Sequence, residues 1–433
     1  MRARAFSFLT LVLITFLLVG GTPTRIVAAH SIAASAPAAR PGLPIGARTL
    51  VGGAGAVLPA PRGRARWIER IRASVAGKPV SVAIGNDGET WYSHRAGIER
   101  PPASNEKLIL SMALFQRFAP DATIRTRAMA VNDPIGGVLR GSLWVVGAGD
   151  PEGGTPAMAA LANQLVDAGI TRIRGRVVGA TTPFVRDWWA RGWRDYFPSV
   201  YIQIPTALTF RGNQVGGRHI ADPERRAARD LRRRLERRGV EVTRGAAMAP
   251  SPGGLHELAE VRSAPLSTIV RHMNVPSSNL RAEVLGKYLG RDRFGQPSID
   301  GGARAIEAFV RARGFTARAY DSSGLSYANR VSARTVLKLL WFADRRAWGE
   351  ALRDSLPMGG QGTLEDRLES VIVHAKTGTL IDVSALSGWV WLERSQEWAE
   401  FSILSSGIDA STAKSIESRI VRIVANTATD PAP

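Results

Sequence analysis

No cysteine occurs among the 433 residues of the chain, so no disulfide can hold its fold together. A chain of this kind must be stabilised by burial of a hydrophobic core. The length suffices for two domains, or for one large domain that carries an insertion. Without a thiol, a thiolate nucleophile is excluded as well.

The first residues are typical of an exported protein. Two arginines precede an apolar run at residues 6–19, and the small residues Ala34-Ser35-Ala36 follow it. This order predicts a secretory signal peptide over residues 1–36. The alternative is an uncleaved membrane anchor, but the run is shorter than the roughly 18 residues that a membrane-spanning helix needs. Residues 37–64 are rich in Pro, Ala and Gly, which predicts a flexible linker.

We therefore expect the protein in the cell envelope or an equivalent periplasmic space, free or peripheral to the membrane. Its formal charge of +20 favours contact there with anionic wall polymers or lipid head groups. The densest basic run, Glu224 to Arg238, places Leu231 and Leu235 on one face of a predicted helix. This pattern indicates a structural helix with an arginine-rich outer face. The run has no interleaved aromatic residues, so nucleic-acid binding is not expected.

The six histidines are scattered and form no H-E-x-x-H or similar spacing. With no cysteine available as a ligand, the sequence predicts neither a metal site nor a cofactor. The oligomeric state is left open.

Lysine is rare in this chain, with six residues against 51 arginines. Arginine stays protonated in proteins, whereas a buried lysine can lose its proton and act as a base. A lysine retained in such a chain therefore indicates a position where arginine would not serve. Two of the six, Lys107 and Lys376, lie in motifs that need this property.

The first motif is Ser-x-x-Lys. It places Ser104 and Lys107 one turn apart at the start of a predicted helix. A neutral Lys107 could take the proton of Ser104, and the free N–H groups of the helix start would favour the developing negative charge. The alternative is an N-capping serine beside a chance lysine. Alone the motif is weak, because a second copy, Ser411 to Lys414, occurs without partner motifs after it.

Two further motifs follow along the chain. Ser277-x-Asn279 opens a predicted helix, where a simple N-cap is the alternative. Lys376-Thr377-Gly378 ends a predicted strand, and such an edge offers a cation, a hydroxyl and an approachable backbone to a bound peptide. An ordinary strand end with a glycine turn is the alternative. In this order the three motifs form the triple used by serine acyl-enzymes of the penicillin-binding and β-lactamase class.

Longer stretches between about residues 80 and 425 extend the likeness. On them the chain resembles the class C low-molecular-mass penicillin-binding proteins, the D-alanyl-D-alanine carboxypeptidase/endopeptidase group. The stretches that carry the resemblance are PPASNEKL, GSLWVVGAGDP, GWRDYFPSVYIQIPTAL, NVPSSNLRAE, YDSSGLSYANRVSARTVLKLL, LPMGGQGTLEDRL and HAKTGTLIDVSALSGWV.

The resemblance implies a role for each motif residue. Ser104 would attack the carbonyl of the penultimate D-alanine to form an acyl-enzyme, with Lys107 as the general base. Ser277, held by Lys107 and Lys376, would relay a proton to the leaving nitrogen. Asn279 would hydrogen-bond the amide of the substrate.

The resemblance also implies how the substrate terminus is bound. Lys376 and Thr377, together with Gly378 and Thr379 at the strand edge, would bind the terminal carboxylate. The backbone N–H groups of Ser104 and Thr379 would form the oxyanion hole. The positive charge of Lys376 is expected to help lower the pKa of Lys107.

The implied activity is that of a serine-type D-alanyl-D-alanine carboxypeptidase or endopeptidase on peptidoglycan stem peptides, with β-lactams acylating the same serine. The sequence does not separate the two peptidase activities. A β-lactamase-like hydrolase is one alternative, but no acid that would activate its deacylating water is assignable. A non-catalytic cell-wall-binding protein is the other, and the three intact motifs argue against it.

The sequence departs from the family pattern in places. Ser278 stands where the family often has Asp, at a variable position of the motif. Glu106 precedes Lys107 and is expected to point away from the site. The insertion between the first two motifs is shorter than in many members, which puts a nested subdomain in doubt.

The expected fold is α+β, a penicillin-binding-protein/β-lactamase-like transpeptidase domain with helices on a mainly antiparallel sheet. Residues 65–123 and 262–427 would form this catalytic domain. Residues 124–261 show short β-like runs, such as Leu139 to Val146, and predict a β-rich inserted domain. After Lys376, two alternating runs predict a hairpin.

Overall fold

The computed structural model of the chain describes residues 62–393 and 395–427. The predicted signal peptide over residues 1–36 and the predicted linker up to residue 61 lie outside the described residues. The linker was predicted to reach residue 64, but helix α1 (Arg62–Val75) already begins at Arg62. Within the described ranges, every helix is too short or too polar to cross a membrane.

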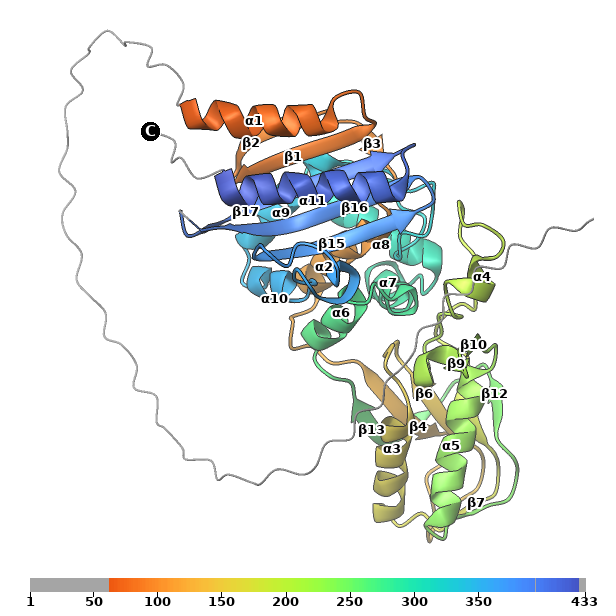
Figure 1. Cartoon of the computed structure of the whole chain (residues 1–433). Coiled ribbons are helices and arrows are strands. Elements are labelled where there is room, and N and C mark those ends of the chain that lie inside the picture. Colours follow the sequence, from red (N-terminus) through yellow and green to blue (C-terminus); the bar gives the residue numbers. More distant parts are fainter. Residues whose placement is uncertain (1–61, 394, 428–433) are drawn as a thin grey trace, which may run out of the picture. The chain divides into compact units, whose positions relative to one another are not determined.

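An antiparallel five-stranded sheet is formed by strands near both ends of the described part of the chain (Figure 1). Its strand order is β15-β16-β17-β1-β2, so the first strand of the chain pairs with the last. The strands are β1 (Val80–Asn86), β2 (Glu89–His94), β15 (Val373–Leu380), β16 (Val383–Leu392) and β17 (Glu397–Ser406). The strands β16 and β17 pair in antiparallel fashion, which confirms the predicted hairpin.

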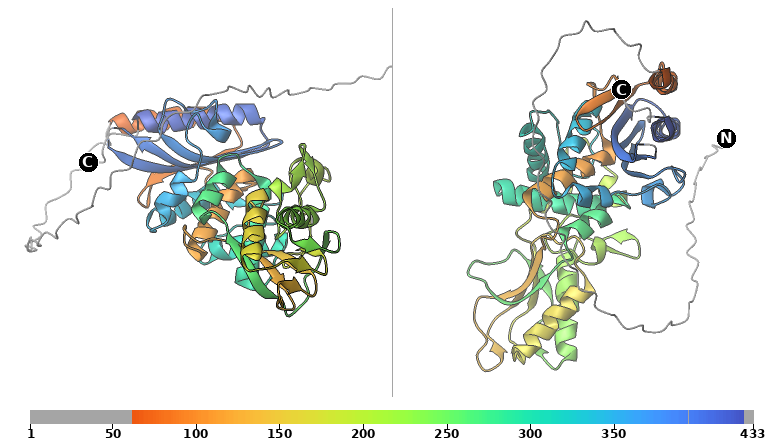
Figure 2. Two further views of the ribbon diagram at one scale, coloured as in Figure 1. Left: turned by 90° about the horizontal axis from the view of Figure 1, so that it is seen from below. Right: turned by 90° about the vertical axis from the view of Figure 1, so that its left-hand side faces the viewer.

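Two helices cover one face of this sheet. The helices α1 and α11 (Ala410–Thr427) lie side by side on it (Figures 1 and 2). Trp67 and Ile71 of α1 and Ile420 and Val424 of α11 belong to one buried cluster with Phe401 of β17. Side chains of a strand alternate between the two faces of the sheet, so Phe401 faces these two helices while its neighbours in the strand face the other side. A second layer of helices packs on that opposite face.

The other helices pack on the opposite face. In this layer α2 is buried on all sides, as its run of fully buried residues from Leu108 to Leu110 and at Met112 and Leu114 shows. Its core cluster also holds Trp389 of the sheet. The helices of this layer are α2 (Glu106–Arg117), α6 (Leu266–Asn274), α7 (Asn279–Phe294), α8 (Ile299–Arg311), α9 (Ala333–Asp344) and α10 (Gly349–Asp354).

The chain leaves this layer after α2 and builds a second five-stranded sheet before α6. Its order is β12-β8-β6-β4-β13, with parallel pairing of β8 to both β6 and β12. The strands are β4 (Arg125–Ala130), β6 (Leu143–Gly147), β8 (Val177–Ala180), β12 (Ala247–Ala249) and β13 (His256–Arg262). The predicted α+β fold with a β-rich addition is thus confirmed, although two helices, α3 (Thr155–Asp167) and α5 (Pro223–Arg237), pack with this sheet.

One predicted strand of the insertion is wrong. The run from Leu139 to Val146 is divided between β5 (Val138–Leu139) and β6, which belong to different sheets. The residues between them, including Gly141, form a bend. Glycine has no side chain to pack on a sheet and permits such a change of direction. The strand β5 instead joins the small parallel sheet β11-β7-β5, with β7 (Arg172–Ile173) and β11 (Glu241–Val242).

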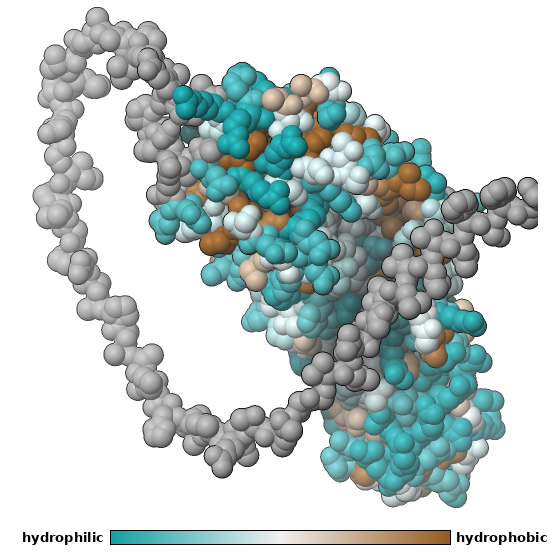
Figure 3. Space-filling view, in the orientation of Figure 1, coloured by the Kyte–Doolittle hydropathy of each residue, from teal (hydrophilic) through white to brown (hydrophobic). Residues whose placement is uncertain are grey.

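The arginine-rich run forms α5, as the sequence predicted. Leu231 and Leu235 are fully buried, while Arg225, Arg229 and Arg233 are exposed. In the view of Figure 3, the surface over α3 and α5 is mostly hydrophilic. The helix is therefore amphipathic, with one apolar stripe and a solvated basic face.

One segment of the predicted insertion packs away from the second sheet. Within residues 185–205, Trp193, Phe197 and Ile202 form a buried cluster with Ile299 and Leu325 of the helical layer. The predicted boundaries of 124 and 261 therefore enclose a stretch that belongs, by its contacts, beside α7 and α8.

Candidate active site

Ser104 lies in the 3₁₀ turn Ala103–Asn105, which leads directly into α2. The turn is tightly enclosed. Ala103 has a φ of 46°, a left-handed conformation that is uncommon for a residue other than glycine. A Cβ added to Gly324 would lie 1.8 Å from the Ala103 carbonyl oxygen, so only glycine fits behind the turn. Ser104 is thus fixed at the start of a buried helix.

The ammonium of Lys107 contacts three oxygen atoms. Its Nζ lies 3.0 Å from Ser104 Oγ, 2.8 Å from Asn279 Oδ1 and 2.5 Å from the carbonyl oxygen of Ser323. The side chain is fully buried. The structure therefore brings Ser104, Lys107 and Asn279 together around one nitrogen.

Burial lowers the pKa of Lys107 to about 8, because the charged form loses its hydration. Asp321, Glu283 and Glu106 oppose this shift, since their negative charges favour the protonated lysine. A pKa near 8 leaves a useful fraction of neutral amine close to physiological pH, as a general base requires.

The two buried lysines also affect each other. Burial, and after it the charge of Lys107, holds the pKa of Lys376 well below its usual value. For Lys107, burial is the main cause of the lowered pKa.

Ser277 and Lys376 form a second pair across the same site. Lys376 Nζ donates to Ser277 Oγ at 3.0 Å and to the carbonyl oxygen of Thr377 at 3.0 Å. Ser277 has a φ of 58°, a strained backbone for serine. It directly precedes Ser278, whose hydroxyl caps α7. The N-cap alternative therefore holds for Ser278, and the side chain of Ser277 is directed to Lys376 instead.

The strand β15 lies against the turn that carries Ser104. The side-chain amide of Asn105 donates to the carbonyl oxygen of Lys376 at 3.0 Å. A Cβ at Gly378 would lie 2.7 Å from the carbonyl oxygen of Pro102 and 3.0 Å from the backbone nitrogen of Ser104. Glycine in the Lys-Thr-Gly motif is therefore required for this close approach. The next residue, Thr379, is exposed at the edge.

These residues open onto one pocket of about 590 Å³. One wall is aromatic, with Phe197 packed edge-on against Tyr196 and Tyr201. The pocket is lined by Ser104, Tyr196, Phe197, Tyr201, Ser277, Asn279, Leu325, Tyr327, Thr379, Leu380, Ile381, Asp382, Asp409 and Ala410. The two motif serines, Asn279 and the strand-edge residue Thr379 thus share a cleft large enough for a short peptide end.

Glu106, which was expected to point away from the site, does not line the cleft. Its carboxyl group is buried behind Lys107, near Glu283 and Asp321. Burial raises its pKa well above the usual value, and the charges of Asp321 and Glu283 add to the shift. Helical spacing turns a residue that directly precedes Lys107 to another side of α2, but α2 is buried on every side. Glu106 therefore meets other acids rather than solvent.

Two acids that the sequence reasoning missed support the ammonium of Lys107 indirectly. Glu283 Oε1 accepts the backbone N–H groups of Ser322 and Ser323 at 2.9 and 2.7 Å, and Ser323 presents its carbonyl to Lys107. Asp321 accepts the side-chain amide of Asn329 at 2.7 Å. Glu283 follows Asn279 by four residues, which is about one helical turn. The sequence therefore places both side chains on one face of the predicted helix, and this spacing is the signal that could have identified Glu283.

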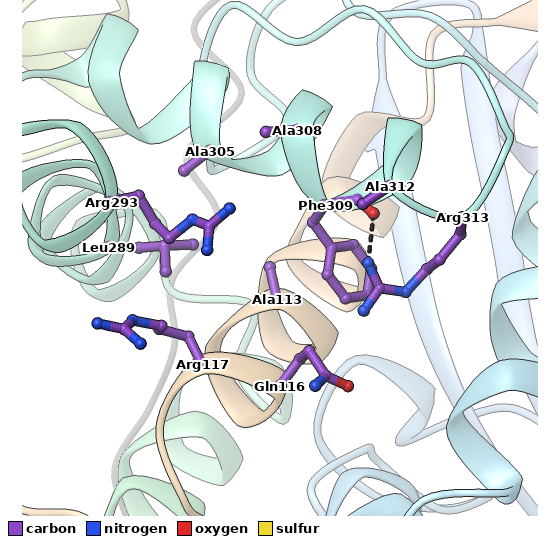
Figure 4. Close-up of a pocket in the computed structure, with 10 residues that line it drawn as sticks. All are labelled: Ala113, Gln116, Arg117, Leu289, Arg293, Ala305, Ala308, Phe309, Ala312 and Arg313. Atoms are coloured by element: carbon purple, nitrogen blue, oxygen red, sulfur yellow. Dashed lines mark hydrogen bonds between the residues drawn. The ribbon is translucent and has the colours of Figure 1, made fainter.

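A second pocket lies away from this cleft. It has a volume of about 250 Å³, lies between α2, α7 and α8, and is lined by Arg117, Arg293 and Arg313 among others (Figure 4); none of the motif residues lines it. The second Ser-x-x-Lys copy lies at the start of α11, where Ser411 is exposed and hydrogen-bonds Asp409 at the rim of the cleft without lining the cleft itself. In the described residues, no group of three histidine or acidic side chains is placed to hold a metal ion.

A serine hydrogen-bonded to a buried lysine, on helices packed against an antiparallel sheet, is typical of the serine acyl-enzymes that include penicillin-binding proteins and β-lactamases. Within this class, the chain belongs to the D-Ala-D-Ala carboxypeptidase 3 (S13) family, whose profile matches residues 69–219 and 213–427. It is accordingly a serine-type, penicillin-binding hydrolase of the D-alanyl-D-alanine carboxypeptidase kind, as the resemblance implied.

Relatives support this membership. The chain is 26% identical over 439 residues to a D-alanyl-D-alanine carboxypeptidase of Actinomadura sp. (strain R39), with 80% of each chain covered. It is 28% identical over 352 residues to a carboxypeptidase of Mycobacterium tuberculosis, with 74% of each covered. The crystal structure of penicillin-binding protein 4 from Haemophilus influenzae has the same fold, with a TM-score of 0.70 at 20% identity over 82% of this chain and 97% of that one.

Proposed function

We propose that the protein cleaves the terminal D-alanyl-D-alanine bond of peptidoglycan stem peptides through an acyl-enzyme on Ser104. One observation carries this proposal. Lys107 Nζ lies 3.0 Å from Ser104 Oγ, and Lys376 Nζ lies 3.0 Å from Ser277 Oγ, at a single cleft. This arrangement supplies a nucleophile with its base and a second hydroxyl for proton transfer.

Acylation begins at Ser104. Neutral Lys107 takes the hydroxyl proton while Oγ attacks the carbonyl carbon of the penultimate D-alanine. The oxyanion accepts hydrogen bonds from the backbone N–H groups of Ser104 and Thr379. Ser277 then gives its proton to the leaving nitrogen, the C–N bond breaks, and Ser277 recovers a proton through Lys107. Free D-alanine leaves, and water later hydrolyses the ester.

Substrate binding falls to the strand edge and to α7. Lys376, Thr377 and Thr379 bind the terminal carboxylate, and Gly378 lets this edge lie close to Ser104. Asn279 donates its side-chain amide to the acyl amide of the substrate. In the structure that amide donates to the carbonyl oxygen of Tyr201 at 2.9 Å, so the donor already faces the aromatic wall.

Incubation with a stem pentapeptide that ends in D-alanyl-D-alanine is expected to release one D-alanine per peptide, as measured by mass spectrometry. The same peptide ending in L-alanyl-L-alanine serves as the control and is expected to stay intact, because the inverted stereocentre turns the carboxylate away from Lys376. A cross-linked peptide dimer, tested in parallel, distinguishes endopeptidase from carboxypeptidase activity. An intact D-alanyl peptide, with a protein that penicillin does label, would contradict the proposed substrate.

We further propose that the protein is exported and that its basic surface holds it on anionic wall polymers. The charge of +20 and the exposed arginines of α5 support this location. Purified protein is expected to sediment with isolated cell walls in about 0.05 M salt and to be released by about 0.5 M salt, since salt screens exposed charges. Sedimentation that does not change with salt would contradict an electrostatic attachment.

A further inference from the structure

A third lysine is as deeply buried as the two in the motifs. Lys107, Lys287 and Lys376 are all fully buried, whereas Lys78 is exposed and Lys338 and Lys414 are partly exposed. The proposed chemistry uses only Lys107 and Lys376. In a chain that otherwise prefers arginine, a buried Lys287 calls for its own explanation.

The side chain of Lys287 extends from α7 to the point where the first and last residues of the 185–205 segment come together. Its Nζ donates to the carbonyl oxygens of Val185 at 3.0 Å, Asp187 at 3.2 Å and Pro205 at 2.9 Å, and it pairs with Asp187 Oδ1 at 2.5 Å. One ammonium therefore holds both ends of this segment. Burial lowers its pKa, and the carboxylate of Asp187 opposes that shift.

The same face of α7 holds the segment at a second point. Asn279 lies two turns before Lys287 and donates to the carbonyl oxygen of Tyr201. Asn279 and Lys287 are eight helical residues apart, which is about 12 Å along α7. Residues 201–205 belong to no helix or strand, and four residues of chain can span up to about 13 Å. The chain from Tyr201 to Pro205 is therefore long enough to follow α7, and it is attached to the helix at both ends.

The attached segment carries the aromatic wall of the cleft. Tyr196 and Tyr201 are 43% and 51% exposed at the pocket, and Phe197 lies buried between them and the helical layer. Just outside the segment, Phe184 and Ala207 pack on Leu280 and Val284 of α7. Any shift of the Pro205 end along α7 would therefore move Tyr201 and the acceptor that orients Asn279.

We propose that Lys287 is a positioning residue, which fixes residues 201–205 in register along α7 and thereby sets the orientation of the Asn279 amide at the cleft. The inference rests on the proposed function, in which Asn279 binds the acyl amide of a ligand. Lys287 itself does not line the pocket and touches no reacting atom.

The choice of lysine follows from the shape of its surroundings. The acceptors converge on one point from three backbone carbonyls and one carboxylate. A compact ammonium with three donors satisfies such a cluster, whereas the planar fork of arginine spreads its donors over a larger area. The third buried lysine is thereby explained without assigning it to the chemistry.

The test uses Lys287→Met in the full chain and two β-lactams that share one nucleus. Benzylpenicillin carries an acyl amide side chain, and 6-aminopenicillanic acid lacks it. The second-order rate constant of acylation is expected to fall about 10-fold or more for benzylpenicillin and less than about 3-fold for 6-aminopenicillanic acid, because only the former needs the oriented amide of Asn279. Lys338→Met, which removes a partly exposed lysine of α9, is expected to change neither.

Hydrogen exchange gives a readout that does not depend on activity. In Lys287→Met, the backbone amides of residues 188–204 are expected to exchange about 10-fold faster, while those of β16 and β17 stay unchanged. Asp187→Asn, which keeps the three carbonyl acceptors, is expected to show both effects in milder form and serves if Lys287→Met does not fold. Equal losses with the two β-lactams, or unchanged exchange in residues 188–204, would overturn the inference. If benzylpenicillin fails to acylate the unmodified protein, the proposed function fails and the exchange result still decides the role of Lys287.

Discussion

Replacing Ser104 by alanine is expected to abolish covalent labelling of the protein by a fluorescent penicillin on a denaturing gel. The substitution removes the only hydroxyl that Lys107 Nζ contacts in the structure described here. Hydrolysis of the peptide substrate should fall on the order of 10⁴-fold or more, as losses of a nucleophile do. Ser104 is only partly buried and its hydroxyl makes a single hydrogen bond, so the fold should survive.

The second Ser-x-x-Lys copy provides the matched control. Ser411→Ala alters an exposed serine of α11 and is expected to leave labelling unchanged. A labelled Ser104→Ala protein would contradict the assignment of the nucleophile. An unlabelled but folded wild-type protein would favour the non-catalytic wall-binding alternative. A label that vanishes within seconds would indicate a β-lactamase-like hydrolase.

Replacing Lys107 by arginine is expected to slow acylation about 10³-fold, within the range that general-base catalysis contributes. Arginine keeps the positive charge but cannot give up its proton near neutral pH. In the wild type, the neutral amine is the active form, so the rate should rise about tenfold per pH unit below 8 and level off above it, because the pKa of Lys107 is about 8.

The acids behind Lys107 will shape this profile. Asp321, Glu283 and Glu106 all favour the protonated amine. Burial raises the pKa of Glu283 to about 8, so this group titrates in the same range and its ionisation will broaden the rise. Stopped-flow acylation between pH 6 and 9.5 measures the effect, with Lys338→Arg on α9 as the control. A flat profile, or a Lys107→Arg rate within tenfold of the wild type, would rule out Lys107 as the base.

The sequence was most informative where function depends on short spacings. Ser104 and Lys107 are one turn apart, so their contact could be predicted from helical geometry alone. The order of the three motifs then indicated which distant segments meet. The β16–β17 hairpin and the amphipathic α5 could be predicted for the same reason, since each is defined by a local period.

The supporting residues were missed because they depend on contacts between distant parts of the chain. Glu283 and Asp321 meet behind Lys107 only after three segments have packed together, and the only local signal is the one-turn spacing of Glu283 from Asn279. The scarcity of lysine did contain a signal for Lys287. In a chain that prefers arginine, any lysine on a helix face that the fold buries occupies a special position, whether or not it lies in a motif.

The strand order of the central sheet has a consequence for how the protein is made. Strand β1 pairs with β17. Close to this pair, Arg100 donates a hydrogen bond to Ser406, which lies 306 positions later in the chain. Lys376 is likewise supplied by one of the last strands. During synthesis, the sheet of the insertion precedes the last strands, and the nucleophile has neither its partner strand nor its second lysine until β15 has been made and has paired with the β16–β17 hairpin. Such long-range closure is slow, and we expect a chain that lacks β15 to β17 to be unable to complete the site around Ser104.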